Sequence, residues 1–410
     1  MKKSRFTNFF TDRASEGIRS VNLTENILSE LISFGIGTAF GIFLFCVKGI
    51  RKRIIYYLHV KKLRKSDFIF DEALNIYTIE NAVPEYSYIK MIPSSKKLFV
   101  NIPDGYRERI SKEHEFHYNT SFDGAASFRD LSIQTGIYDL EKLVEIHSAK
   151  IATAFEHGYD GCKFNEKKYG VLNVEIGSRK DIEERPYASI TTFETDFFTY
   201  RVFHSIYKEL LSRKHEIIAV DSLEKLIKYN CFICSIGINA LLEVDAMKYN
   251  KTDLLLTKRS GEVINYRNMY HISANEGLCY MDYNASKGSF SLENCLFRGL
   301  QEEIGIPMEH HVKTNTEYSL WDIFISRDTF DFSISAFVRL KGLYYKDIQS
   351  FIAKDKAFEI NRLTPVKAEE AIIKKFVSEH NFVPQGLFVL NSFFVRRFGH
   401  AISIPHKKKD

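Results

Sequence analysis

The residues best suited to chemistry lie in the stretch SFSLENCLFRGLQEEIGI, residues 289–306. Arg298 is a cation of the kind that pairs with phosphate, while Glu302 and Glu303 are adjacent carboxylates of the kind that binds divalent cations. A plainer interpretation is equally open, in which the glutamates end a solvated helix. Arg298 and Glu302 would then form an i, i+4 ion pair worth a few tenths of a kcal/mol.

A helix must position these side chains. Leu292, Leu296 and Leu300 recur every four residues, which predicts a helix with one buried face. Gly305 follows at the place where a glycine ends a helix. Gly299 lies inside the predicted helix, where glycine costs about 1 kcal/mol relative to alanine. Its presence therefore permits a close approach to the backbone and does not strengthen the helix.

The same stretch resembles the second half of the NUDIX box, which usually ends in R-E-U-x-E-E-x-G-U with U aliphatic. The matching residues are Arg298, Leu300, Glu302, Glu303, Gly305 and Ile306. At average residue frequencies, such a match would occur by chance in only about one chain in a thousand. The resemblance implies that carboxylates on the helix hold divalent cations against a pyrophosphate. It makes Glu302 and Glu303 the metal ligands and catalytic residues if the protein is active.

The chain departs from the NUDIX pattern at three places. Gly299 replaces the first acid of the helix, and Phe290 occupies the position of the upstream glutamate. The sequence HISANEGL, residues 271–278, stands where the family's glycine pair is expected. The incomplete motif leaves catalysis undecided and favours a protein that is not an enzyme.

The surroundings extend the resemblance from about Cys231 to Gly399. Strands are predicted over 231–245, 252–260, 316–326 and 330–342, with a closing helix over 383–399. Lys258 and Arg259 end the second strand, where they either contact phosphate or remain solvated charges. Glu359 lies where the family often supplies another acid. The resemblance predicts a NUDIX-like α/β/α sandwich over residues 230–400.

An apolar run precedes this part of the chain. Residues 31–47 carry no charge, and residues 27–47 are long enough to span a bilayer. A buried core helix is the alternative. The G-x-x-x-G of Gly37 and Gly41 hints at self-association. Basic residues crowd the C-terminal flank, which predicts a single-pass protein with a cytosolic body: Lys48, Arg51, Lys52, Arg53, Lys61, Lys62, Arg64 and Lys65.

We predict an α+β chain with six segments. Around the helix over 27–47 and the domain over 230–400 lie a tail over 1–26, a collar and connector over 48–101, a mixed α/β domain over 102–229 and a basic tail over 401–410. Within the middle domain, helices are expected at 140–157 and, capped by Asp196, at 196–215, with strands at 169–178 and 187–195. His147, His157, Asp160 and Cys162 meet no standard metal-ligand spacing.

Composition narrows the class further. The chain has 410 residues, 45% of them hydrophobic, and a net charge of +5, which is ordinary globular material. Its six cysteines lack the dense spacing of a disulfide framework, so a reducing compartment fits best. Cys231 and Cys234 form a C-x-x-C inside an apolar run, which predicts a buried strand and not a zinc site.

A membrane helix joined to an incomplete NUDIX domain resembles the transmembrane effectors that carry a SMODS-associated NUDIX domain, which belong to CBASS antiphage systems of bacteria. The resemblance implies that the cytosolic part binds a cyclic oligonucleotide, without any cofactor. It also implies that the chain assembles as a homo-oligomer and disrupts the inner membrane. The ligand contacts expected in this case come from Arg298, Lys258 and Arg259.

Two other functions remain open. One is a membrane-tethered NUDIX hydrolase of nucleoside diphosphate derivatives, which would use Mg²⁺ on Glu302 and Glu303 and a displaced acid in place of the missing one. The other is a nucleic-acid-binding regulator. It ranks last, with no nucleic-acid partner predicted, because the basic residues concentrate at the membrane collar and not in the body.

Overall fold

A computed structural model describes most of the chain from Phe68 onward. The described residues are 68–79, 88–106, 110, 127–159, 162, 165–177, 187–247, 251–261, 265–307, 309, 316–353 and 360–402. The predicted membrane helix over 27–47, the basic collar, Glu359 and most of the basic tail lie outside them. Within the described ranges, no helix has the length and apolarity needed to cross a bilayer.

The larger of two sheets has nine strands and contains the strands predicted around the motif. Its order is β1-β2-β12-β13-β6-β7-β14, with β8 beside β7 and β9 beside β6. β13 and β6 are parallel, and the other pairs of neighbouring strands described in this sheet are antiparallel. The bounds are β1 Phe68–Asp71, β2 Ile76–Ile79, β6 Ile236–Asp245, β7 Thr252–Arg259, β8 Tyr270–His271, β9 Ala274–Gly277, β12 Thr316–Ser326, β13 Phe332–Tyr344 and β14 Ile360–Lys367.

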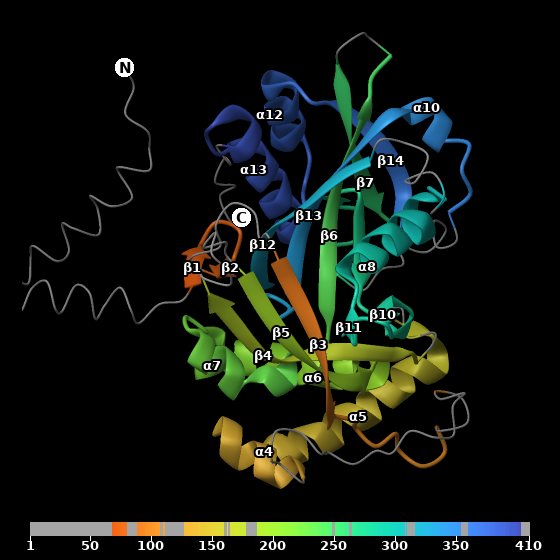
Figure 1. Cartoon of the computed structure of the whole chain (residues 1–410). Coiled ribbons are helices and arrows are strands. Elements are labelled where there is room, and N and C mark those ends of the chain that lie inside the picture. Colours follow the sequence, from red (N-terminus) through yellow and green to blue (C-terminus); the bar gives the residue numbers. More distant parts are fainter. Residues whose placement is uncertain are drawn as a thin grey trace, which may run out of the picture. The chain divides into compact units, whose positions relative to one another are not determined.

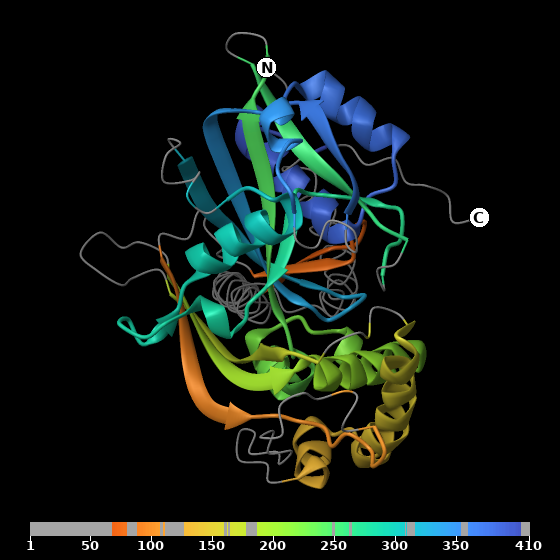
Figure 2. The ribbon, with the colours of Figure 1, turned by 90° about the vertical axis from the view of Figure 1, so that its right-hand side faces the viewer.

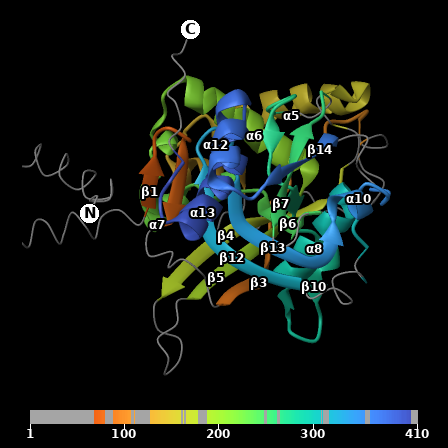
Figure 3. The same ribbon diagram turned by 90° about the horizontal axis from the view of Figure 1, so that it is seen from above.

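Alternation along the strands gives this sheet two buried faces. In β7, Leu254 and Leu256 belong to the apolar cluster of α12 (Glu370–Glu379) and α13 (Pro384–Phe398), whereas Leu255 belongs to the cluster that contains α8 (Leu292–Gly299). Successive side chains of a strand point to opposite faces. The helices α12 and α13 therefore cover one face and α8 the other (Figures 1 and 3). The predicted closing helix is confirmed as α13.

The second sheet has five strands in the order β10-β11-β3-β5-β4. Its bounds are β3 Tyr88–Lys97, β4 Lys167–Gly177, β5 Tyr187–Asp196, β10 Tyr283–Asn284 and β11 Ser289–Phe290. Helix α6 (Phe197–Ser212) packs on β5, α5 (Leu140–His157) packs on α6, and α4 (Phe128–Thr135) packs on α5 (Figure 2). The helices and strands predicted for this region are confirmed.

Local sequence explains where α6 starts. The Asp196 carboxylate accepts a hydrogen bond from the backbone N–H of Thr199 at 2.7 Å, which satisfies one of the unpaired donors of the first turn. Shorter elements complete the described part. They are α7 Leu223–Lys228, α10 Tyr345–Ile348, the 3₁₀ turns Glu216–Ile218, Asn230–Phe232 and Tyr280–Asp282, and a π-helical turn Leu300–Ile304 that extends α8.

Two predicted limits need correction. The segment over 48–101 is not only a collar and connector, because β1 and β2 belong to the nine-stranded sheet and β3 to the five-stranded one. Pro93 indicated a connector and not a strand. It is tolerated in β3 because, among the described residues, β11 pairs with β3 only at Met91, so this pairing does not extend to Pro93. The limit at 229/230 is also crossed, since β10 and β11 from the predicted NUDIX-like part complete the five-stranded sheet.

The sequence predicted that the C-x-x-C lies in a strand, but it lies just before one. Cys231 belongs to a 3₁₀ turn and Cys234 precedes β6, with its thiol donating to the carbonyl of Cys231. Both side chains are buried, and burial raises the pKa of each thiol above its ordinary value. They fill the core as neutral thiols.

Candidate functional site

Arg298 stands at the centre of the motif region, on the last turn of α8. Its guanidinium donates to both carboxylate oxygens of Asp282 at 3.1 and 2.9 Å. It also contacts Glu276 at 2.8 Å and Glu302 at 3.1 Å, and it donates to the carbonyl of Gly277 at 2.7 Å. Burial opposes its charge, yet these acidic partners raise the pKa of Arg298 above its ordinary value. The cation ties the helix to the segment that follows β9.

This network bears on the predicted phosphate contact of Arg298. Its side chain is only 13% exposed, and three carboxylates already neutralise it. A phosphate would have to displace one of those carboxylates to reach the guanidinium, at the cost of leaving it without its partner. The geometry therefore assigns Arg298 a positioning task within the fold.

The two glutamates of the motif are also engaged. Glu302 makes the i, i+4 pair with Arg298 that the sequence allowed. Glu303 is buried, and its carboxylate accepts a hydrogen bond from the backbone N–H of Asn275 at 2.8 Å, which fastens the helix end to β9. One oxygen of each carboxylate is thus committed to a partner within the fold, Oε2 of Glu302 to Arg298 and Oε1 of Glu303 to the backbone of Asn275. A cation here would have to share these carboxylates with those partners or displace them.

Gly299 allows the closest contact in the motif. A β-carbon built on it would lie 2.5 Å from the β-carbon of Glu276, although its φ of −59° is ordinary helix. The predicted close approach to the backbone is thus confirmed. Glu276 occupies the space into which an acid at position 299 would extend. The helix then continues through its π-helical turn to Gly305, whose φ of +88° ends it as predicted.

Phe290 stands where the upstream acid of the motif is expected, and it packs against aromatic side chains there. It lies in β11 opposite Met91 of β3, and its ring centroid is 4.4 Å from that of Tyr169 and 5.5 Å from that of Tyr283. The side chain is buried. An acid here would be buried among aromatic rings. The phenylalanine instead packs the motif region against the five-stranded sheet.

The predicted basic pair lies apart from this network in the contacts between described residues. Lys258 and Arg259 end β7, and both are partly buried. Arg259 donates its backbone N–H to Met269 at 2.9 Å. No contact in the described ranges joins either residue to Arg298, Glu302 or Glu303. The five predicted site residues therefore do not converge on one set of contacts.

A pocket of about 590 Å³ opens between α5 and α6, in a region where the sequence indicated no site. Each helix contributes residues at i, i+3, i+4 and i+7, so two facing rows form the walls. The polar rows on the two predicted helices were the only feature of the sequence that could have indicated this pocket. The sequence did not show that the two helices pack against each other. The lining residues are His147, Lys150, Ile151, Thr153, Ala154, Tyr159, Arg201, His204, Ser205, Lys208 and Glu209.

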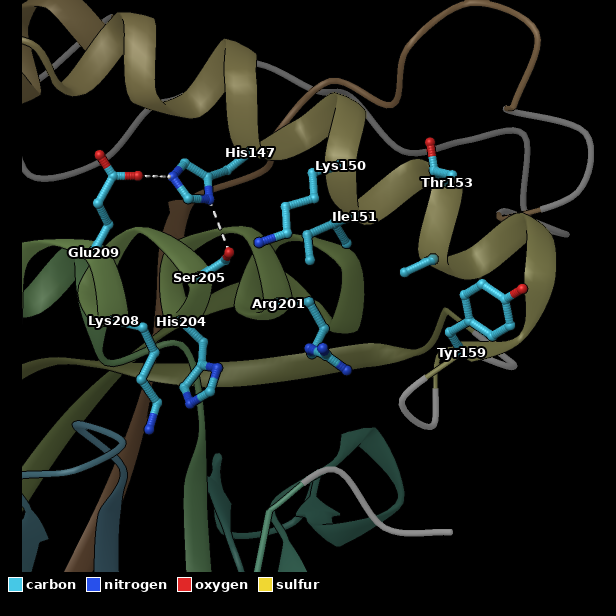
Figure 4. Close-up of a pocket in the computed structure, with 11 residues that line it drawn as sticks. His147, Lys150, Ile151, Thr153, Tyr159, Arg201, His204, Ser205, Lys208 and Glu209 are labelled. Carbon is cyan, nitrogen blue, oxygen red and sulfur yellow. Dashed lines mark hydrogen bonds and ion pairs between the residues drawn. The ribbon is translucent and has the colours of Figure 1, made fainter. Parts of the chain in front are cut away.

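Figure 4 shows how these side chains lie. Arg201, His204 and Lys208 extend from α6, Lys150 reaches toward them from α5, and Tyr159 lies at one end. His147 is held by Ser205 and Glu209, each 2.8 Å from a ring nitrogen, so it braces the two helices against each other.

Two nitrogen-bearing side chains of the pocket, Arg201 and His204, are buried. Arg201 is 6% exposed and donates to the thiol of Cys162 at 3.2 Å. His204 is 9% exposed; burial and the nearby charges of Lys208 and Arg201 lower its pKa to about 3, so its ring is neutral at pH 7. His147 and Cys162 thus have separate partners. In the described part of the chain, no group of three or more acidic, cysteine or histidine side chains is arranged to hold a metal ion.

Part of this chain is similar to NUDIX proteins of known structure. No family model and no curated protein match the chain. The chain is similar to a mutT/nudix family protein from Listeria innocua, with 15% identity, 40% of this chain and 92% of that one covered, and a TM-score of 0.27. DR0079 from Deinococcus radiodurans has 12% identity over 39% and 83% of the two chains, with a TM-score of 0.27.

A third similar structure contains a ligand. It is the NUDIX domain of Shewanella oneidensis NrtR complexed with ADP ribose, with 15% identity, 39% of this chain and 86% of that one covered, and a TM-score of 0.24. Identities and TM-scores of this size establish no family for the chain.

Proposed function

We propose that this protein is a membrane-anchored effector of a CBASS-like bacterial antiphage system. Its cytosolic body, with a NUDIX-like C-terminal part, binds a cyclic oligonucleotide without hydrolysing it. Binding drives assembly of the chain into a homo-oligomer at the inner membrane, and the predicted helix over 27–47 then disrupts that membrane. A ligand can drive such a change only if it binds the assembled state more tightly.

The motif geometry carries the non-hydrolytic half of this proposal. Glu276 fills the space beside Gly299, and the carboxylates of Glu302 and Glu303 are bound to Arg298 and to a backbone N–H. A hydrolase needs carboxylates free to hold cations around a pyrophosphate. The residues that remain of the NUDIX pattern instead hold a helix in place, which supports a protein that binds its ligand without hydrolysing it. Assignment to antiphage defence rests on the resemblance of the chain's architecture.

The second candidate is a NUDIX hydrolase of nucleoside diphosphate derivatives. One observation favours it: Glu276 lies beside position 299 and is the nearest available substitute for the missing acid. In that function Glu276, Glu302 and Glu303 would exchange their present partners for Mg²⁺ once substrate arrives.

A single preparation separates the two functions. Full-length protein in detergent is titrated calorimetrically with cyclic di- and trinucleotides and with linear nucleotides, with Mg²⁺ or with EDTA, while product formation is followed by chromatography. The sensor binds one cyclic species tightly, in either medium, and forms no product. Magnesium-dependent cleavage without preference for a cyclic ligand would refute the sensor.

Two additions sharpen the test. The Glu302→Gln variant keeps cyclic nucleotide binding if the protein is a sensor, whereas a hydrolase loses turnover. Vesicles that contain the protein and an entrapped dye should release the dye only after the bound cyclic nucleotide is added. Binding without release would separate the sensing half of the proposal from the membrane half.

A further inference from the structure

We infer that the pocket between α5 and α6 is the ligand site, and that it holds the phosphates of a nucleotide with its base against Tyr159. This inference deepens the proposed function: it rests on that function for the ligand class, a cyclic oligonucleotide, and adds a location. The pocket lies in the middle part of the chain, away from the NUDIX-like residues Lys258, Arg259 and Arg298 from which phosphate contacts were expected.

The charge of the pocket selects an anion. Lys150, Arg201 and Lys208 contribute three positive charges, against the single carboxylate of Glu209. That carboxylate is already engaged, because His147 and Arg213 both contact it. In the part of the chain that the structure describes, neither Lys150 nor Lys208 has an ion-pair partner. The pocket thus presents cations that a phosphate can pair with.

Burial gives a second, independent indication. His204 is about nine-tenths buried, and its Nε2 has no hydrogen-bond partner among the described residues. A buried polar atom without a partner typically costs about 1–3 kcal/mol, so such atoms usually have one. Tyr200 stacks on the His204 ring at 5.8 Å and is itself held by a hydrogen bond to Asp331. The ring is therefore fixed where it lines the pocket, ready to bond a ligand oxygen.

Size and composition fit a nucleotide. A volume of about 590 Å³ lies within the roughly 300–1,000 Å³ of small-molecule sites. The aromatic ring of Tyr159 is 63% exposed and so is accessible to a ligand, and the apolar side chains of Ile151 and Ala154 also line the pocket. A base can stack on the Tyr159 ring while the phosphates contact the cations at the other end of the pocket. Base stacking on an aromatic side chain combined with cations along the phosphates is common in proteins that bind nucleic acids.

Helix α6 also links the pocket to the nine-stranded sheet. Its Tyr200 hydroxyl donates to Asp331, and its Tyr207 hydroxyl donates to the carbonyl of Arg327. Both acceptors flank the turn between β12 and β13. A ligand that moves α6 would therefore act directly on the sheet that carries the NUDIX-like elements.

The test uses full-length protein in detergent and calorimetry with cyclic di-AMP, cyclic GMP–AMP and cyclic tri-AMP. The Lys150→Ala/Lys208→Ala variant removes two exposed cations from the pocket. The matched control, Lys142→Ala/Lys287→Ala, removes two exposed lysines elsewhere. A third variant, Lys258→Ala/Arg259→Ala, removes the basic pair on β7. Because each lost phosphate contact weakens binding by roughly tenfold, the pocket variant should bind about 10- to 100-fold more weakly. The control should bind like the original protein.

A footprint on the unaltered protein supports the variants. Bound cyclic nucleotide should protect Lys150 and Lys208 from amine-modifying reagents, detected by mass spectrometry, and leave Lys142 reactive. Unchanged affinity of the pocket variant, together with loss of binding in the Lys258→Ala/Arg259→Ala variant, would overturn the location and leave the proposed function standing. Failure of the original protein to bind any cyclic nucleotide would overturn the proposed function itself.

Discussion

Replacing Gly299 with alanine tests the central contact of the motif. The backbone of Gly299 is helical, so helix propensity alone favours alanine by about 1 kcal/mol. The new β-carbon, however, would lie 2.5 Å from the β-carbon of Glu276, a position fixed by the pairing of β9 with β6. Forcing the helix and strand apart costs about 1–3 kcal/mol, as overpacking does. We expect a net loss of about 1 kcal/mol, and at most about 2.

The assay is urea unfolding followed by the fluorescence of Trp321, the single tryptophan of the chain, which is buried in the nine-stranded sheet. Gly261→Ala is the control, because a β-carbon at Gly261 meets nothing within 4 Å. Its unfolding midpoint should stay close to that of the original protein.

A double-mutant comparison isolates the cause. The three atoms nearest to a β-carbon at position 299 all belong to the Glu276 side chain, so Glu276→Gly removes them together. In that background the helix propensity acts alone, and Gly299→Ala should stabilise the protein by up to about 1 kcal/mol. The sign of the effect reverses between backgrounds. A stabilising effect of the same size in both would refute the contact as the reason for glycine at this position.

Three further predictions concern other described side chains. Phe290→Ala should lower the free energy of unfolding by about 3–5 kcal/mol by opening a cavity, measured by denaturant titration, and Phe290→Glu should not confer hydrolysis. Arg298→Met should cost about 3–5 kcal/mol by leaving three carboxylates without their cation; equal stability in thermal unfolding would contradict this. His204 should stay neutral in NMR titrations to near pH 3. Because its pKa is lowered in the folded state, the unfolded state binds the proton first, and the free energy of unfolding should fall as pH drops below about 6.5. The His204→Gln variant should reduce the slope of this fall by up to about 1.4 kcal/mol per pH unit.

Elements governed by neighbours in the chain were predictable. The spacing of Leu292, Leu296 and Leu300 indicated α8, and Gly305 ends the helix as glycine in a left-handed conformation does. Asp196 caps α6 because its carboxylate reaches a backbone N–H three residues on. Such signals need only a few consecutive residues, so the sequence by itself determined these elements and the α+β class.

Contacts between distant segments were decided only by the tertiary structure. Glu276 and Gly299 are separated by a hairpin that pairs with a different sheet, so no spacing in the sequence places them together. Phe290 fits an expected acid position by register, yet its burial against Tyr169 depends on β11 joining β3. The pocket likewise exists only because α5 packs on α6, which sets two separate rows of polar residues facing each other. Periodicity shows which face of a helix is special, but only packing shows what that face meets.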